Sequence, residues 1–544
     1  MMKSISLLFA LCLAANASAQ PGKGTWDVFA HGAKGDGQAM DTRAIQKAID
    51  QCHAAGGGKV YLHNGRFLSG TLYLKSNVAL HIEAGAVLLG SGNADDYPDA
   101  ASVYPTYVSD TMTSKAFIYA ENVKNIAIEG RGTIDGRGDV IDKRGLKDAY
   151  LFPSFMYRPR IIHIRGSEHV RVKDITLFNS GSWVQTYQQC TDLIIDGITV
   201  DSRENKDVEQ KNREHTARHR NTDGLDLVDC EKVRISNCMI NSGDDAICLK
   251  SFSPDKACRD ITISNCIVSA GASGIKIGTE TAGAFEDITV QNCVVYDTWG
   301  EGIAIMTADG ARIERVIISG ISLRNIKRSG IFVRLNTRNR TYGSNSAVNK
   351  PHLRDIIIEN IQGSRLASLG CSVTGIEGLP LENIVLSNIN LAFEGGVKSA
   401  PAVSEIPEKQ NAYPAGAMFG PALPAYGFFI RHVNGMTLDN VRLKFSSEDT
   451  RPAIACSNTE ALVIRQLKAQ GTTATKALIH LENTKNTLIS ESRSLSPIPV
   501  FTAVEGNRSH NLVLMNNDLS NSEQKVVFSD PAAKASLKEF NNIE

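Results

Sequence analysis

A nine-residue phrase with alternating apolar residues recurs along most of the chain, and it constrains the fold more than any other feature. Copies of the phrase begin at Asp192, Lys232, Asp260, Asp287, Arg315, Asp355 and Asn383. Several of the intervals are 27 or 28 residues long, and others are longer where a loop is inserted. A fixed period of this length is typical of a solenoid. The period-2 alternation of Ile, Val and Leu indicates strands rather than helices.

One such repeat cannot bury its apolar face alone, so neighbouring repeats must stack. Coils stacked at the strand spacing of about 4.8 Å bury a continuous core and pair every backbone. We therefore predict an all-β chain that forms a single right-handed parallel β-helix. Residues 41–55 instead carry apolar residues at helical spacing and end at a run of three glycines. We expect this segment to form an N-terminal helix that caps the open edge of the first coil.

The N-terminus has the features of a secretion signal. Lys3 lies near the start, an apolar run extends from residue 5 to residue 15, and small residues occupy positions 17–19. We predict that residues 1–19 are a signal peptide and that the protein is exported to the periplasm or the extracellular space. No other apolar stretch approaches the roughly 20 residues that span a bilayer. Residues 20–544 are expected to form one β-helix domain, with inserted loops near 137–158, 203–220 and 402–426.

The composition is balanced in charge and rich in regularly spaced cysteines. Lysine plus arginine and aspartate plus glutamate number 58 each, which argues against binding of nucleic acid through bulk charge. Cys238, Cys266 and Cys293 are spaced by 28 and 27 residues, which favours stacked buried thiols over disulfides. The asparagines that precede them, such as Asn237 and Asn265, predict an inward ladder of side chains with a structural role.

Three carboxylates lie in two short phrases near the middle of the chain. The phrase NTDG at 221–224 contains Asp223, and the phrase GDD at 243–245 contains Asp244 and Asp245. About one turn of the repeat separates the phrases, so the three carboxylates should stack on one wall of the coil. Inverting glycosidases use two carboxyl groups about 6.5–9.5 Å apart, and crowding raises the pKa of one of them. The cluster predicts hydrolysis of a glycosidic bond, with solvated turn carboxylates as the alternative.

Alignment of successive coils places further polar residues on the same outward strip. The inward columns are defined by Leu225 and Leu227 and their equivalents, and the residues beside and between these columns should face outward. On this basis, we predict the following substrate-binding residues: Asn221, Lys250, Ser273, Lys276, Glu301 and Arg334.

The two acidic phrases, together with the stretch from Gly32 to Ser91, resemble the polygalacturonases and their relatives in glycoside hydrolase family 28. The resemblance covers most of the chain to about residue 395. It implies inverting hydrolysis of a pectic polysaccharide or oligosaccharide, either galacturonan or rhamnogalacturonan. By position, Asp244 would be the general acid, and Asp223 and Asp245 would position and deprotonate the attacking water. We expect no metal ion and no other cofactor.

The sequence departs from the family pattern at a histidine and at the two basic residues that, in the family, hold the substrate carboxylate. Ser273 stands where the family carries a histidine, and 304–306 reads Ala-Ile-Met where the family carries Arg-Ile-Lys. A bidentate arginine site is not replaced by Ala or Met. The chain therefore resembles a divergent member of the family. Recognition of the uronate has then moved to Lys250, Lys276 and Arg334, or the bound sugar is different.

Three insertions around the cleft would make it a pocket, which favours exo action at chain ends. Two other functions remain open at this point. A β-helix polysaccharide lyase would use the acids to hold Ca²⁺ and a lysine as base, and a non-catalytic β-helix would only bind glycan. The expected partner is a pectic glycan substrate. We expect no nucleic acid, no membrane span and a monomer.

Overall fold

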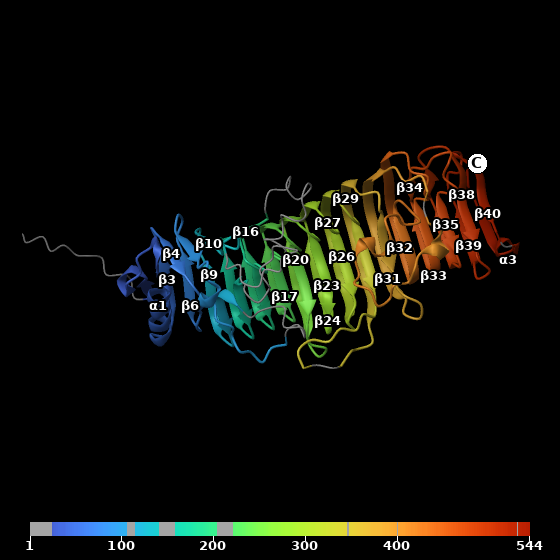
Figure 1. Cartoon of the computed structure of the whole chain (residues 1–544). Helices are drawn as coiled ribbons and strands as arrows, with labels where there is room; N and C mark the ends of the chain where they lie inside the picture. Colours follow the sequence, from blue (N-terminus) through green and yellow to red (C-terminus); the bar gives the residue numbers. More distant parts are fainter. Residues whose placement is uncertain are drawn as a thin grey trace, which may run out of the picture.

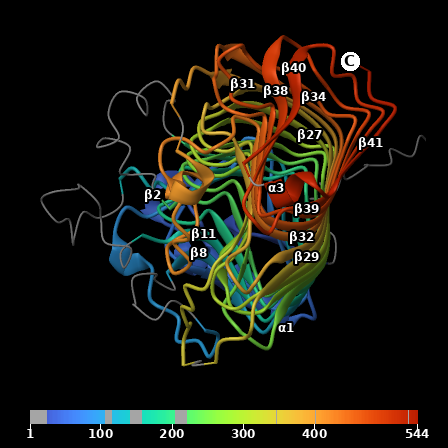
Figure 2. The same cartoon turned by 90° about the vertical axis from the view of Figure 1, so that its right-hand side faces the viewer.

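The computed structural model describes residues 24–105, 115–140, 158–203, 221–344, 347–399, 401–529 and 531–543. Within these ranges the chain winds into one long stack of coils, from the N-terminal end to the C-terminal end (Figure 1). The end-on view shows the coils lying one behind another around a common interior (Figure 2). Strands of successive coils pair in parallel. The predicted all-β, right-handed parallel β-helix is confirmed.

Strands at equivalent positions in successive coils form three parallel sheets. The first sheet, which carries the acidic phrases, runs in order through β5 (Leu72–Tyr73), β8 (Ala116–Glu121), β11 (Arg160–Arg165), β14 (Gln185–Gln188), β17 (Leu225–Val228), β20 (Ile247–Ser251), β23 (Ile275–Thr281), β26 (Ile303–Thr307), β28 (Ile331–Leu335), β30 (Cys371–Thr374), β35 (Ile479–Glu482), β38 (Ile498–Glu505) and β40 (Ser522–Phe528). Between β30 and β35, the order passes through two of the long strands given below.

The second sheet and the third sheet follow the same order along the stack. The second sheet contains β1 (Thr25–Asp27), β3 (Gly58–Leu62), β6 (Val78–Ile82), β9 (Lys124–Glu129), β12 (Glu168–Lys173), β15 (Thr191–Asp196), β18 (Glu231–Ser236), β21 (Ala257–Ser264), β24 (Ala284–Gln291), β36 (Lys485–Ser490), β39 (His510–Met515) and β41 (Leu537–Phe540). The third sheet contains β2 (Asp36–Met40), β4 (Arg66–Ser69), β7 (Val87–Gly90), β10 (Thr133–Asp135), β13 (Thr176–Phe178), β16 (Thr199–Ser202), β19 (Met239–Ser242), β22 (Ile267–Ala270), β25 (Val294–Thr298), β34 (Lys468–Ala469) and β37 (Arg493–Ser494).

Five long strands bend around a corner and take part in more than one sheet. They are β27 (Arg312–Ile326), β29 (His352–Leu366), β31 (Leu381–Gly395), β32 (Phe428–Ser447) and β33 (Ile454–Arg465). For example, β32 pairs with β30 in the first sheet, with β31 in the second and with β34 in the third. These strands carry the coil from one sheet to the next without a break.

The predicted inward column is buried and in register. Leu225 pairs with Ile247, and Ile247 with Ile275, so equivalent residues of successive coils lie directly above one another. The column continues through Ile303 and Ile331, and each of its members is almost completely buried. Parallel strands with matched apolar columns keep the register fixed, because a shift of one residue would turn every apolar side chain outward.

The predicted capping helix is also confirmed. Helix α1 (Thr42–Ala54) lies at the N-terminal end of the stack (Figure 1) and contacts β1, β3 and β5. Its buried face consists of Ile45, Ala48, Ile49 and Cys52. The helix covers backbone that would otherwise form the open edge of the first coil. Shorter helical pieces are η1 (Phe29–His31), η2 (Ala94–Asp96) and α3 (Pro531–Lys534).

The recurring asparagines are structural, but their predicted orientation is wrong. Asn237, Asn265 and Asn292 are exposed, and all three have positive φ, between 55° and 58°. Asn237 donates from Nδ2 to Asp196 Oδ1 at 2.9 Å. Asparagine tolerates the left-handed conformation that the turn between two sheets requires. The turn therefore explains the residue type, and the side chains form their contacts on the outside of the coil.

The cysteine columns lie inside the coil. The ten cysteines of the described ranges are buried with free thiols, and Cys238, Cys266 and Cys293 occupy equivalent positions in three successive coils. These side chains fill the core as small apolar groups. Among the described residues, no helix combines the length and the apolar character that a membrane crossing would need.

Of the three predicted insertions, one can be described. Residues 402–426 form an irregular segment between β31 and β32, with two short turns, η5 (Val403–Glu405) and η6 (Gly416–Phe419). We refer to residues 402–426 as the wall loop. The other predicted insertions, near 137–158 and 203–220, lie almost wholly outside the described residues, as does the predicted signal segment 1–19.

Candidate active site

Two neighbouring strands of the first sheet bring the three carboxylates together. Asp223 lies two residues before β17, and Asp245 lies two residues before β20. The backbone N–H of Gly224 donates to the carbonyl of Asp245 at 2.8 Å, which fixes the two acidic phrases side by side. One oxygen from each of Asp223, Asp244 and Asp245 lies within 4.8 Å of the others. This spacing is tighter than the expected separation of about 6.5–9.5 Å, because two of the residues are sequence neighbours and the third lies one coil away.

Asp244 is placed to hold a proton. Its carboxylate accepts from the backbone N–H of Asn221 at 3.0 Å and from that of Asp245 at 3.1 Å. Burial, followed by the charge of Asp245, raises the pKa of Asp244 to about 6. A carboxyl group with this pKa remains partly protonated in mildly acidic solution, as a general acid must. Asn221 contributes through its backbone.

Asp245, in contrast, is held in its ionised form. Burial raises the pKa of Asp245, but the charges of Lys276 and Lys250 outweigh burial and lower it below its usual value. Lys276 donates from Nζ to Asp245 Oδ2 at 2.7 Å, and the backbone N–H of Ser273 donates to Oδ1 at 2.9 Å. Asp245 therefore stays ionised beside a protonated Asp244. This is the division that acid–base catalysis requires.

Asp223 has a different environment from the other two acids. Burial, followed by the charges of Asp226 and Asp244, raises its pKa well above the usual value, and Lys250 opposes that shift. The Oδ1 atom of Asp223 has no hydrogen-bond partner among the described residues. A buried oxygen without a partner is costly unless water satisfies it. Asp223 thus offers a place for one water molecule at the edge of the cluster.

A fourth carboxylate, Asp226, has an oxygen within 4.8 Å of one oxygen of Asp223 and was not among the predicted site residues. It is fully buried, and burial raises its pKa to about 7 despite Lys250. Lys250 Nζ lies 3.4 Å from Asp226, 3.5 Å from Asp223 and 3.2 Å from Glu280. The ammonium also lies 4.7 Å from the centre of the Trp183 ring. Lys250 is therefore a buried support for the acids rather than a surface contact.

Lys250 and Lys276 offset the negative charge of the acidic cluster. Asp223, Asp244 and Asp245 are a set whose oxygens could surround a cation. Lys276 and Lys250 already supply positive charge to this set, at 2.7 Å from Asp245 and 3.5 Å from Asp223. The side chains thus balance the cluster without a metal ion. The lyase alternative, which requires acids that hold Ca²⁺, is not favoured by this arrangement.

A pocket of about 100 Å³ opens over Asp244 and Asp245. Three predicted residues line it: Ser273, Lys276 and Glu301. Three further residues that sequence reasoning missed also line it: Trp299, Arg328 and Tyr413. The pocket therefore combines acids, two cations and aromatic rings. This composition suits the binding of a sugar.

The wall loop forms one side of the pocket. Glu301 accepts at Oε1 from the backbone N–H of Gly416 at 2.7 Å and at Oε2 from Ser273 Oγ at 3.0 Å. Tyr413 Oη accepts from Thr279 Oγ1 at 2.6 Å and from Lys276 Nζ at 3.3 Å. Tyr413 is nevertheless 54% exposed, so the ring is presented to solvent while the hydroxyl is anchored. Glu301 therefore fixes the wall loop to the coil.

The missing basic residues of the family pattern are replaced by apolar packing. Ala304, Met306 and Phe332 are buried in one cluster with residues of the wall loop such as Met418 and Phe419. Part of the strip predicted to face outward is therefore covered. The side chains that replace the basic residues support the wall loop instead.

Arg334 also supports the wall loop, which corrects its predicted role in substrate binding. The side chain is completely buried. Its guanidinium donates to the carbonyl of Gly375 at 2.7 Å, to the carbonyl of Glu408 at 2.6 Å and to Asn336 Oδ1 at 2.6 Å. Arg334 occupies the strand position that the repeat predicts, but the wall loop covers that position.

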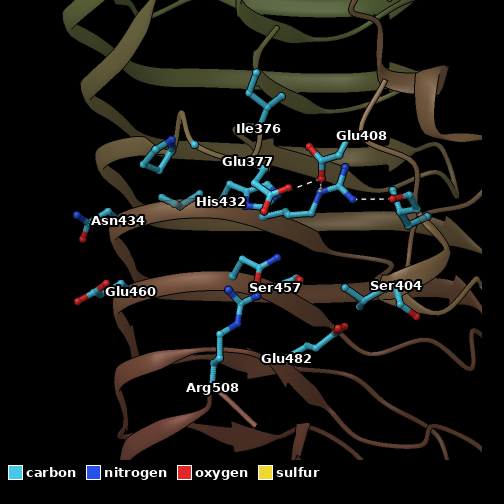
Figure 3. Close-up of a pocket in the computed structure, with 17 residues that line it drawn as sticks. Ile376, Glu377, Ser404, Glu408, His432, Asn434, Ser457, Glu460, Glu482 and Arg508 are labelled. Atoms are coloured by element: carbon cyan, nitrogen blue, oxygen red, sulfur yellow. Dashed lines mark hydrogen bonds and ion pairs between the residues drawn. The ribbon is translucent and has the colours of Figure 1, made fainter. Parts of the chain in front are cut away.

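A second and larger pocket, of about 540 Å³, lies toward the C-terminal coils (Figure 3). The far side of the wall loop contributes Glu408, which lies 3.0 Å from His432 and 3.3 Å from Arg431. Arg508 and Glu482 come from later coils. The carboxylate cluster does not line this pocket. Chemistry rather than size therefore identifies the smaller pocket as the candidate active site.

A parallel β-helix that places a carboxyl group with a raised pKa beside an ionised carboxylate has the features that hydrolysis of a glycosidic bond requires. The sequence pattern of glycosyl hydrolases family 28 matches residues 59–412, and the chain belongs to this family. The resemblance noted from the acidic phrases is thereby confirmed. The chain is a glycoside hydrolase.

Individual relatives agree with this assignment. A probable polygalacturonase of Vitis vinifera is 26% identical over 68% of this chain and 74% of its own length. An exo-poly-alpha-D-galacturonosidase of Dickeya chrysanthemi is 25% identical over 70% of this chain and 69% of its own length. The solved structure of an exopolygalacturonase from Thermotoga maritima matches with a TM-score of 0.53 and 20% identity, covering 69% of this chain and 88% of that one. The structural match supports the fold.

Proposed function

We propose that this protein is an inverting hydrolase of pectic polysaccharides or oligosaccharides, either galacturonan or rhamnogalacturonan, and that it acts from chain ends. The observation that carries the proposal is the pairing of Asp244, with a pKa raised to about 6, and Asp245, whose pKa is lowered by Lys276. The names of the relatives support a galacturonide substrate. The wall loop, which closes one side of the pocket, supports exo action.

The residues divide the reaction among themselves as follows. Asp244 donates its proton to the leaving oxygen of the glycosidic bond. Asp245 accepts a proton from the attacking water, and Asp223 orients that water through its free Oδ1 atom. The bond from the anomeric carbon to the leaving oxygen breaks as the bond to water forms on the opposite face. A single displacement of this kind inverts the anomeric configuration.

Product analysis tests this proposal directly. We expect the purified protein to release short reducing products from galacturonan or rhamnogalacturonan oligosaccharides, one unit at a time from one end. NMR spectra taken during the first turnovers should show the inverted anomer. This measurement matters because the carboxyl groups lie closer together than in typical inverting enzymes. Retention of configuration, an unsaturated product that absorbs in the ultraviolet, or binding without any reducing product would each contradict the proposal.

We also propose that the protein is exported and acts outside the cytoplasm, as one domain. The signal-like N-terminal segment supports export. The continuous stack of coils supports one domain. Fractionation of the native host, followed by N-terminal sequencing of the mature protein, tests export. A full-length chain in the cytoplasm would contradict it.

A further inference from the structure

Asp244 and Arg328 belong to one column of the β-helix. The backbone N–H of Ala272 donates to the carbonyl of Asp244 at 3.2 Å, and the N–H of Gly300 donates to the carbonyl of Ala272 at 2.8 Å. The N–H of Arg328 then donates to the carbonyl of Gly300 at 3.3 Å. These four residues therefore lie directly above one another in successive coils. Three coil steps place the backbones of Asp244 and Arg328 about 14 Å apart.

The two residues between the ends of this column have almost no side chain. Ala272 and Gly300 both line the pocket. A Cβ atom at Gly300 would lie only 2.8 Å from the carbonyl carbon of Ala272, so no larger residue fits this backbone. The floor between Asp244 and Arg328 is therefore low, and Trp299 and Tyr413 stand beside it. Rings beside a low floor suit a pyranose, whose apolar face packs against them.

Arg328 is the cation in the lining of this pocket whose side chain forms no ion pair with a described residue. Lys276 is paired with Asp245 at 2.7 Å, and Lys250 and Arg334 are buried among protein acceptors. The side chain of Arg328 is half-buried and lines the pocket. Within the described ranges, no side chain forms a hydrogen bond or an ion pair with its guanidinium. A half-buried cation without a counterion in a pocket attracts an anionic ligand.

We propose that Arg328 binds the carboxylate of a uronosyl residue that lies over Ala272 and Gly300, next to the bond that Asp244 protonates. The planar guanidinium matches the geometry of a carboxylate and can bind it through two parallel hydrogen bonds. One arginine from a later coil then takes over the recognition that the family pattern assigns to positions 304 and 306. This inference rests on the proposed function, and it deepens that function by assigning the residue that selects for a free acid.

The test compares Arg328→Met with wild type on matched oligosaccharides. For oligogalacturonides with free carboxylates, we expect kcat/KM to fall on the order of 10- to 100-fold, mainly through KM, as for the loss of a hydrogen-bonded charge pair. For the same oligosaccharides as methyl esters, the two enzymes should differ less than twofold. Arg328→Lys, which keeps the charge without the planar fork, should give an intermediate value. Lys327→Met is the matched control, because Lys327 lies next to Arg328 but near Glu394, at 3.9 Å.

Each outcome has a clear meaning. A loss confined to the free acids, with unchanged thermal unfolding and unchanged Lys327→Met, supports the inference. An Arg328→Met enzyme with wild-type kcat/KM on free acids overturns it, and so does an equal loss on acids and esters. Those two results leave the proposed function standing, because wild type still cleaves galacturonides. A wild-type enzyme that cleaves neither galacturonan nor rhamnogalacturonan oligosaccharides overturns the proposed function, and this inference falls with it.

Discussion

At the scale of single residues, the environment decides which carboxyl group carries the proton. Asp244 and Asp245 are neighbours in sequence, yet the pKa of the first is raised to about 6 and that of the second is lowered. Much of the difference comes from Lys276, whose ammonium donates a hydrogen bond to Asp245 and none to Asp244. The residue type alone could not have assigned these roles.

Asp244→Asn should remove the acid and therefore most of the activity. We expect kcat to fall by roughly 10²- to 10⁴-fold, the usual contribution of general acid catalysis. In wild type, the active protonated form of Asp244 is present below its pKa of about 6 and is lost as the pH rises through that value. Activity should therefore decline on the alkaline side from about pH 6. Initial rates across pH check both points.

Asp255→Asn provides the control for this substitution. Asp255 is an exposed loop residue outside the pocket. The variant should keep the wild-type pH profile. A wild-type rate for Asp244→Asn, or an alkaline limb that is unchanged in a slow variant, would contradict the assignment of Asp244 as the acid.

Lys276→Met should act on the other limb of the pH profile. Without the ammonium group of Lys276, only the charge of Lys250 opposes the effect of burial, so the pKa of Asp245 should rise. Asp245 would then become protonated at a higher pH, so the acidic limb should move upward by about 1–3 pH units. Rates measured between pH 3 and pH 8 report the shift. An acidic limb that stays in place would show that Asp245 is not the base.

Strand register explains how much of the site could be predicted from the sequence. Asp223, Asp245, Ser273 and Lys276 come together as expected, because parallel pairing converts the spacing of the repeat into distance. Asp226 lies between the two inward columns, where the repeat predicts an outward side chain, but it is completely buried by neighbours that the repeat does not specify. The position of Arg328 could have been predicted. Arg328 lies three residues before β28, just as Asp244 lies three residues before β20.

At the scale of elements, the wall loop determines the shape of the site. It packs against Ala304, Met306 and Phe332, and it is held by Arg334 and Glu301. The sequence indicated an insertion here, because Pro and Gly interrupt the repeat. It could not indicate the path, since a loop without a repeat has no register to follow. Tyr413 was missed for this reason.

Tyr413 offers a test of the wall loop as part of the pocket. Tyr413→Ala should raise KM about tenfold, because the exposed ring that can pack against a sugar is lost. Tyr413→Phe keeps the ring and loses only the hydroxyl that Lys276 and Thr279 contact, so KM should change little. Steady-state kinetics on one oligosaccharide separate the two variants. Equal KM values for Ala and Phe would exclude a role for the ring.

At the scale of the whole molecule, the solenoid is a one-dimensional array, so its ends differ from its middle. The strands of each coil pair only with the coils before and after it. An interior coil has a partner on both sides, whereas the first coil has a partner on one side only. The fold was predictable from the sequence because each repeat carries the same apolar pattern, and α1 was predictable because its pattern differs.

The capping helix should therefore protect the molecule from self-association. Ile49→Asp places a charge in the buried face of α1, where Ile49 has no exposed surface. We expect a loss of at least about 3 kcal/mol in the free energy of unfolding, because a large apolar contact is lost and a charge is buried. Displacement of α1 would expose unpaired strand edges, which pair with other chains. Light scattering should then show oligomers.

Lys47→Asp, on the exposed face of the same helix, should remain like wild type in both unfolding and size. If Ile49→Asp stays as stable and as small as Lys47→Asp, the first coil is closed by something other than this helix.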